Sequence, residues 1–140
     1  MRQLDPSETS RPVEVDPRDL YCPSGIEITP GARYRFDASG QWKDGWITCS
    51  PDGWPGWLLE GWNRLPWRRV FLLCGSVGKD LRHAFPVGSE GEWSAPAEAA
   101  QWADRQLYFF ANDWPGHYDN NHPLGPEEGG PVRVVVTRLC

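Results

Sequence analysis

A short segment of the chain, residues 111–121, concentrates side chains that could bind a metal ion. It reads Ala-Asn-Asp-Trp-Pro-Gly-His-Tyr-Asp-Asn-Asn. Its carboxylates and amides belong to Asn112, Asp113, Asp119, Asn120 and Asn121. Calcium takes about 6 to 8 oxygen ligands and accepts carboxylates, amides, backbone carbonyls and water together. The composition indicates an irregular calcium-binding loop, since the acidic spacing of an EF-hand is absent.

The same segment has a simpler interpretation as a plain connection between strands. Asn, Asp and Gly are common turn-forming residues, and the Pro-Gly pair in its middle is a turn signal. The calcium hypothesis requires more of the loop. Asp113 must follow the end of a strand, and the turn must aim a backbone carbonyl near His117 inward. Asn120 and Asn121 must then return their amide oxygens toward Asp113.

Other kinds of active site find little support in the sequence. The three histidines and four cysteines do not have zinc-finger spacing. There is no Gly-x-Ser-x-Gly elbow and no glycine-rich phosphate-binding loop. The remaining acidic residues do not form a recognisable glycosidase pair, which needs two carboxyls at a defined separation. We therefore expect a binding protein rather than an enzyme.

Length, charge and hydropathy limit the class of protein. The chain has 140 residues and a net charge of −5, which suits one domain with a hydrophobic core. Nucleic acid is not an expected partner, because no basic stretch is present. No apolar run reaches the roughly 20 residues that span a bilayer. The first residues lack a secretory signal, so we expect free thiols and a cytoplasmic location, or export by a non-classical route.

Strand-like segments account for most of the chain. Alternating apolar and polar residues predict a half-buried strand at 32–38, and a continuous apolar run predicts a central strand at 70–77. Pro86 is expected to mark a sheet edge. Further strands are expected at 12–15, 26–28, 41–43, 83–87, 106–111 and 131–139, and one or two helical turns at 95–104. Such short strands are typical of an antiparallel β-sandwich or barrel, here one domain over residues 12–140 after a flexible segment, 1–11.

A long connection, residues 44–66, is rich in tryptophan. A loop of this length in a small domain is usually functional or contains short elements of its own. Three tryptophans near predicted strands are expected in the core: Trp42, Trp67 and Trp93. Four others lie in loops between Gly and Pro residues, where an indole can stack on a sugar: Trp54, Trp57, Trp62 and Trp114.

The metal-binding segment resembles the calcium-and-galactose loop of the PA-IL-like galactophilic lectins. That loop has a strand, Asn-Asp, one residue, Pro-Gly, one residue, Tyr, one residue, Asn-Asn and then a valine-rich strand. Residues 107–121 and 132–136 follow this pattern. Weaker matches occur upstream at Ile28-Thr-Pro-Gly31, at Ala38-Ser-Gly40 and at Leu73-Cys-Gly-Ser-Val-Gly78. The resemblance covers most of residues 26–138 and implies a small jelly-roll-like β-sandwich.

The resemblance also implies a set of ligands for the ion. The side chains of Asp113, Asn120 and Asn121 and the backbone carbonyl of His117 would coordinate calcium. A further carbonyl is placed at Asp44. In the family, two hydroxyls of the galactose ring bind the ion directly, and Asp113 and Asn120 would also form hydrogen bonds with those hydroxyls.

One side of the family's sugar site is changed in this chain. In the family, a loop ahead of the central strand supplies a His and a Gln that contact the hydroxymethyl group of the sugar. Residues 44–66 contain neither, and Trp114 replaces a small residue of the family's loop. We therefore expect the ligand to contact Trp54, Trp57, Trp114 and His117, besides Asp113 and Asn120.

The sequence thus predicts calcium-dependent carbohydrate binding, with a galactoside as one candidate ligand. The alternative is a structural or protein-interaction β-sandwich in which calcium, if bound, only stabilises the loop and the tryptophan-rich surface meets a partner. The sequence leaves open which sugar binds, how the cysteines pair and whether the chain forms a homo-oligomer.

Overall fold

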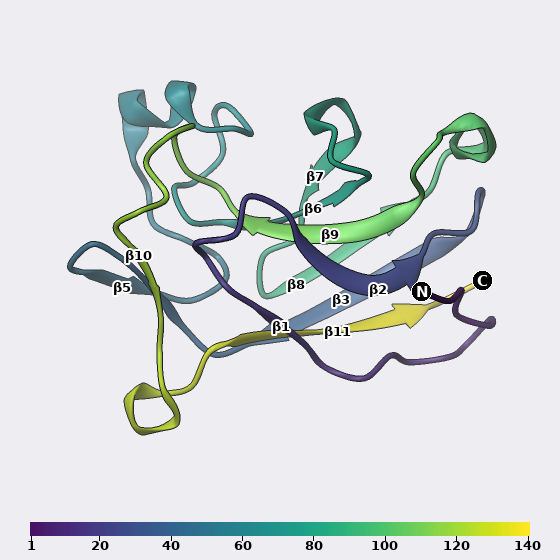
Figure 1. Cartoon of the computed structure of the whole chain (residues 1–140), viewed down its shortest axis with the longest axis horizontal. Coiled ribbons are helices and arrows are strands. Elements are labelled where there is room, and N and C mark those ends of the chain that lie inside the picture. Colours follow the sequence, from purple (N-terminus) through teal and green to yellow (C-terminus); the bar gives the residue numbers. More distant parts are fainter.

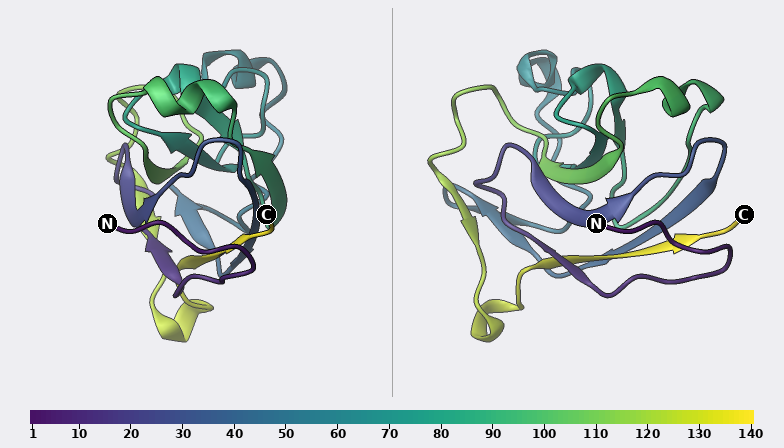
Figure 2. Two further views of the ribbon diagram at one scale, coloured as in Figure 1. Left: turned by 90° about the vertical axis from the view of Figure 1, so that its right-hand side faces the viewer. Right: turned by 45° about the vertical axis from the view of Figure 1, so that its right-hand side comes forward.

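Two four-stranded antiparallel sheets face each other and enclose the core. The computed structural model describes residues 1–140, except for the side chain of Pro126. One sheet has the strand order β1-β11-β3-β8, and the facing sheet has the order β2-β9-β6-β7. A third sheet, of order β10-β4-β5, lies at one end of the sandwich (Figures 1 and 2). The expected antiparallel β-sandwich is confirmed.

The elements are short. The strands are β1 Val13–Val15, β2 Cys22–Glu27, β3 Arg33–Ser39, β4 Trp42–Asp44, β5 Ile47–Cys49, β6 Leu73–Val77, β7 Ala84–Pro86, β8 Glu90–Ser94, β9 Gln106–Ala111, β10 Asn121–Pro123 and β11 Val132–Arg138. The 3-10 turns are η1 Trp57–Trp62, η2 Leu81–His83, η3 Ala97–Gln101 and η4 Pro126–Glu128. In the described part of the chain, no helix has the length and apolar character needed to cross a membrane.

The core follows from the alternation of side chains along the strands. On β3, Tyr34 and Phe36 are fully buried while Arg35 between them is exposed. The Phe36 ring reaches the facing sheet, where its centroid lies 6.0 Å from that of Phe109 and 5.7 Å from that of Phe85. Burying a side chain of this size contributes about 1.5–3 kcal/mol. The predicted alternation thus turns Phe36 inward, and its packing against Phe85 and Phe109 stabilises the contact between the two sheets.

The expected central strand and the expected sheet edge are both present. All residues of β6 are buried, and this strand lies between β9 and β7. A strand covered on both faces needs a continuous apolar run, as this one has. Pro86 ends β7, which is the edge strand of the same sheet. An edge position tolerates a residue without an N–H donor.

Several expectations about local structure are wrong. Strands β5, β8 and β10 lie in segments expected to be loops. β8 escapes detection because it is an edge strand: Trp93 is half-buried, whereas Glu90 and Glu92 face solvent. Trp67 was expected in the core but is 65% exposed, while Trp42 is fully buried as expected.

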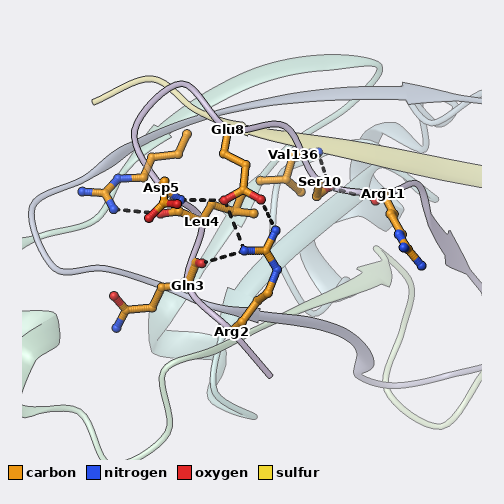
Figure 3. A network of polar contacts seen from close by, with 9 residues as sticks. Arg2, Gln3, Leu4, Asp5, Glu8, Ser10, Arg11 and Val136 are labelled. Carbon is orange, nitrogen blue, oxygen red and sulfur yellow. Dashed lines mark hydrogen bonds and ion pairs between the residues drawn. The ribbon is translucent and has the colours of Figure 1, made fainter.

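The first residues run along the sandwich beside the chain's end (Figure 3). Leu4 is only 2% exposed. Arg2 forms an ion pair with Glu8 (Figure 3). The hydroxyl of Ser10 accepts a hydrogen bond from the Val136 N–H of β11 at 3.0 Å. These contacts attach the segment to the sheet; the division between a flexible segment and a domain starting at residue 12 stays a prediction.

Candidate functional site

Pairing between β4 and β10 brings the two halves of the expected calcium site together. Asp113 follows closely on the end of β9. The chain then turns and returns as β10, in which Asn121 lies opposite Asp44 of β4. The Asn120 amide donates a hydrogen bond to Asp44 Oδ1 at 3.4 Å. Three expected site residues of the segment 111–121 therefore meet Asp44 of β4 at one end of the sandwich.

A tight turn shapes the loop between Asp113 and Asn120. The His117 N–H donates to the Trp114 carbonyl at 3.1 Å, and Gly116 has φ +82°. Pro at the second position and Gly with positive φ at the third are typical of a type II turn. The turn places His117 at the rim of the pocket described next. Coordination by its carbonyl stays a prediction.

A pocket of about 210 Å³ opens at these residues. It is lined by Asp44, Trp54, Leu59, Val70, Asp113, Trp114, His117 and Asn120. The sequence analysis named all of these except Leu59 and Val70, which are apolar residues of a kind that carries no functional signal in a sequence. Asn121 is fully buried and is not part of the lining. Trp57 is also not part of the lining, and its side chain is 80% exposed.

Two buried oxygen atoms of the site lack a hydrogen-bond donor within the described part of the chain: Asp113 Oδ2 and Asn121 Oδ1. The other atoms of these side chains are engaged. Asn121 Nδ2 donates to the Pro17 carbonyl at 2.8 Å, and Asp113 Oδ1 accepts from the Trp114 N–H at 2.8 Å. An unsatisfied buried acceptor costs about 1–3 kcal/mol. Such atoms call for an ion or a water, and oxygen acceptors fit a hard cation.

The electrostatics of the site also favour a cation. Burial raises the pKa of Asp113 to about 6; the Trp114 N–H lowers it, and the nearby Asp44 charge raises it further. Burial likewise raises the pKa of Asp44, against smaller opposing effects of Trp54 and Asn120. A divalent cation between the carboxyls would favour both charged forms. The described residues contain no cluster of three or more His, Cys, Asp or Glu, so an ion bound here would also need amide and carbonyl oxygens, which calcium accepts as ligands.

Calcium affinity is expected to fall as the pH drops through about 6. Asp113 must be charged to bind the ion, and its pKa of about 6 means that protons compete below that value. The loss should approach tenfold per pH unit once the carboxyl is mostly protonated. Calorimetric titrations near pH 7 and near pH 5 measure the effect, together with proton release on calcium binding near pH 6. Equal affinities at the two pH values would contradict this electrostatic description.

Asn112 anchors the tryptophan-rich connection to the site. Its side chain is fully buried; Oδ1 accepts from the Leu65 N–H at 2.8 Å, and Nδ2 donates to the carbonyls of Leu65 at 3.0 Å and Arg69 at 3.2 Å. Its backbone carbonyl accepts from the N–H of Phe71, which has a left-handed φ of +63°. A left-handed backbone at a bulky residue costs about 1–3 kcal/mol. The Asn112 contacts help to hold the connection in this conformation.

Replacing Asn112 with alanine is expected to lower the free energy of unfolding by about 2–3 kcal/mol, because three partly buried backbone groups lose their partners and a fully buried side chain is removed. Urea denaturation measures the change. Asn120→Ala is the matched control, since Asn120 is an exposed asparagine of the same loop. Without calcium it should change stability by less than about 0.5 kcal/mol. Equal denaturation midpoints for the two variants would show that Asn112 is not an anchor.

A buried arginine lies beneath the same loop. Arg64 is 8% exposed, and its guanidinium carbon lies 4.1 Å from the ring centre of Phe110 and 4.6 Å from that of Tyr21. Its Nη1 donates to the Leu20 carbonyl at 2.7 Å and to the Tyr118 hydroxyl at 3.1 Å. In the described part of the chain, no carboxylate pairs with it. The positive charge of Arg64 is therefore stabilised by aromatic ring faces and neutral oxygens.

Arg64 also joins the tryptophan-rich connection to the site. Its backbone N–H donates to the Asp113 carbonyl at 2.9 Å. The Tyr118 hydroxyl, which accepts from the Arg64 side chain, donates to the Ala111 carbonyl at 2.6 Å. Both ends of the loop that carries Asp113 are thus fixed against this one residue. Sequence reasoning missed Arg64, because a single arginine within a long connection gives no sign of burial.

Comparison with known proteins bears on the fold. The chain is similar in structure to the N-terminal domain of EclA, described as a PllA-like lectin, with a TM-score of 0.61 and 22% sequence identity. The match covers 93% of this chain and 94% of that chain. At this identity the likeness establishes a shared fold. No protein-family model matches the chain, and no curated protein matches it significantly.

Proposed function

We propose that this protein binds carbohydrate through a calcium ion held by the side chains of Asp113, Asn120 and Asn121 and by backbone carbonyls at His117 and Asp44. The observation that carries the proposal is the pair of buried oxygens without donors in the described part of the chain, Asp113 Oδ2 and Asn121 Oδ1. Asp113 lines a pocket that opens to solvent, and Asn121 pairs with Asp44, another residue of the lining. The resemblance of the loop to PA-IL-like lectins supports it, as does the likeness in fold to a lectin domain.

The net charge of the proposed calcium centre suits a neutral ligand such as a sugar. If Asp113 is the only carboxylate that binds the ion directly, the centre keeps a net positive charge. Bound calcium supplies open coordination positions, which two neighbouring sugar hydroxyls can fill as neutral oxygen donors. Asp113 and Asn120 line the pocket beside these positions and would form hydrogen bonds with the same hydroxyls. Bonds to a carboxylate are the stronger of these.

The specificity is proposed to differ from that of the galactose-binding family. The chain has no His or Gln within residues 44–66 to contact a hydroxymethyl group. Leu59, Trp54 and Trp114 line the pocket instead. A galactoside stays a candidate ligand through the hydroxyl pair, but the remaining contacts are apolar. We propose a lectin without catalytic activity, because the site offers ligands for an ion and no nucleophile paired with a base.

A glycan array followed by calorimetric titration of its best ligands tests the proposal. Binding should require calcium, disappear with a chelator and return when calcium is restored. Magnesium should restore it poorly, because that ion demands shorter bonds and near-octahedral geometry. Sugar binding that is unchanged by the chelator would overturn the calcium step. Absence of any chelator-sensitive sugar binding, with calcium bound, would overturn the carbohydrate function.

A second candidate function is protein interaction, and one observation favours it. Large apolar side chains are exposed on the tryptophan-rich connection and directly after it: Trp46, Trp57, Leu58, Trp62 and Trp67. Exposed apolar surface of this kind often marks an interface. Sedimentation analysis at several concentrations distinguishes the two candidates. Self-association that is lost in Trp57→Ser would favour an interface, whereas a monomer at all concentrations would argue against one between copies of this chain.

A further inference from the structure

The pocket at the proposed calcium site has two chemically different sides. Asp44, Asp113, Asn120 and His117 form a polar side where the ion would lie. The rest of the lining, called the apolar side below, consists of apolar groups contributed by Trp54, Leu59, Val70 and Trp114. Three of these four belong to, or border, the tryptophan-rich connection, which is the segment that departs from the family's pattern. The two sides therefore make separate demands on a ligand.

The polar atoms of the apolar side are engaged or, in the case of the Trp54 indole nitrogen, buried without a hydrogen-bond partner in the described part of the chain. The Trp114 indole N–H donates to the Leu59 carbonyl at 3.0 Å. The backbone N–H of Trp54 donates to the Val70 carbonyl at 2.8 Å, and the N–H of Val70 donates back at 2.9 Å. The Trp54 indole nitrogen is buried. Within the described part of the chain, this side leaves a ligand hydroxyl no exposed partner, so a hydroxyl placed there would lose its water without compensation.

The apolar side is also held in place and extended outward. The Trp62 ring packs on Trp114 with centroids 5.1 Å apart, and the His117 ring meets Trp114 edge-on at 5.3 Å. Trp62 is 68% exposed, so its ring continues the apolar surface toward solvent. A small apolar group that enters beside the ion would contact Leu59 and Trp114 on a surface whose shape is already set.

We propose that the site selects a deoxy sugar, which turns a methyl group toward Trp54, Leu59, Val70 and Trp114 while a pair of its hydroxyls binds the ion. This inference rests on the proposed function. The ligand class is a hexose with a methyl group in place of the hydroxymethyl group. Burial of the methyl group is favourable on this side, whereas the hydroxyl of a hydroxymethyl group would be desolvated without a partner.

Matched sugar pairs test the proposal by calorimetry in saturating calcium. L-fucose is compared with L-galactose, and D-fucose with D-galactose, since the members of each pair differ only in the oxygen of the hydroxymethyl group. In the pair that binds, the deoxy sugar should bind about five- to tenfold more tightly. The variant Leu59→Asn should reduce that ratio to less than about twofold by offering a hydroxyl a partner. Leu58→Asn is the matched control, since Leu58 is 82% exposed and does not line the pocket; it should keep the full ratio.

The outcomes separate this inference from the proposed function. Equal affinity within a pair, with chelator-sensitive binding of both members, would overturn the deoxy-sugar inference and leave calcium-dependent sugar binding intact. A phenyl galactoside that gains affinity when the deoxy sugar does not would overturn it as well, by assigning the apolar side to an aglycone. If no member of either pair binds although the glycan array gives calcium-dependent ligands, the deoxy-sugar inference is also overturned. If the array also gives none, both proposals fail.

Discussion

Replacing Asp113 with asparagine is expected to weaken calcium binding by about 100-fold or more, and sugar binding should be lost with it. The substitution keeps the size of the side chain and removes its charge. Asp113 supplies one of the two buried oxygens without a donor, and among the expected side-chain ligands it is the carboxylate. Without it, the ion would lie among neutral amide and carbonyl oxygens, which hold calcium far less tightly. Calorimetric titration of calcium measures the loss.

Two controls separate loss of the ion from loss of the fold. Asp119→Asn changes an exposed carboxyl of the same loop that lies outside the pocket, and it should alter calcium affinity by less than about twofold. The calcium-free Asp113→Asn protein should be at least as stable as the parent, because an amide costs less to bury than a carboxylate. An Asp113→Asn protein that binds calcium as well as the parent does would refute the assigned ligand.

Replacing Arg64 with alanine is expected to lower the free energy of unfolding by about 3–4 kcal/mol. The variant loses the stacking of the guanidinium on Phe110 and Tyr21 and the two hydrogen bonds to Leu20 and Tyr118. It also leaves the partly buried Leu20 carbonyl without that donor. Since the Arg64 contacts fix both ends of the loop that carries Asp113, calcium affinity should fall as well. Urea denaturation gives the change in stability.

An exposed arginine nearby serves as the control. Arg68→Ala removes a side chain at the surface of the same connection and should change the free energy of unfolding by no more than about 0.5 kcal/mol. Arg64→Met should lie between the two, because it keeps most of the packed stem and loses the charge and its hydrogen bonds. Identical denaturation midpoints for Arg64→Ala and Arg68→Ala would show that the aromatic cage contributes nothing.

The strands that build the core could be predicted because their pattern is local. Buried and exposed residues alternate along β3 and in the first half of β11, and every residue of β6 is buried. The sequence of each of these segments therefore indicates by itself which residues are buried. The edge strand β8 lacks such a pattern, because none of its residues is fully buried. β8 presents Glu90 and Glu92 to solvent, and its hydrogen bonds to β3 depend on pairing between segments far apart in the sequence. A local pattern does not contain that pairing.

The polar residues of the candidate site and two of its tryptophans, Trp54 and Trp114, could be predicted from the sequence, whereas Leu59 and Val70 could not. Asp113, Asn120 and Asn121 lie in one short segment with recognisable composition. Leu59 and Val70 reach the pocket because Asn112 and Arg64 hold the tryptophan-rich connection against the loop, through hydrogen bonds between residues more than forty positions apart. Trp57 lies outside the lining of the pocket, and its contact with a ligand stays a prediction. The 3-10 turn that it begins directs it to solvent, 80% exposed.

A crystal structure grown with calcium and a bound sugar tests the central claim most directly. We expect an ion at about 2.3–2.6 Å from both Asp113 Oδ2 and Asn121 Oδ1, with two hydroxyls of the sugar in its shell and the sugar beside Trp114. An ion whose shell is complete with protein oxygens would assign calcium a purely structural role. A sugar bound elsewhere, with no ion between Asp113 and Asn121, would contradict the account.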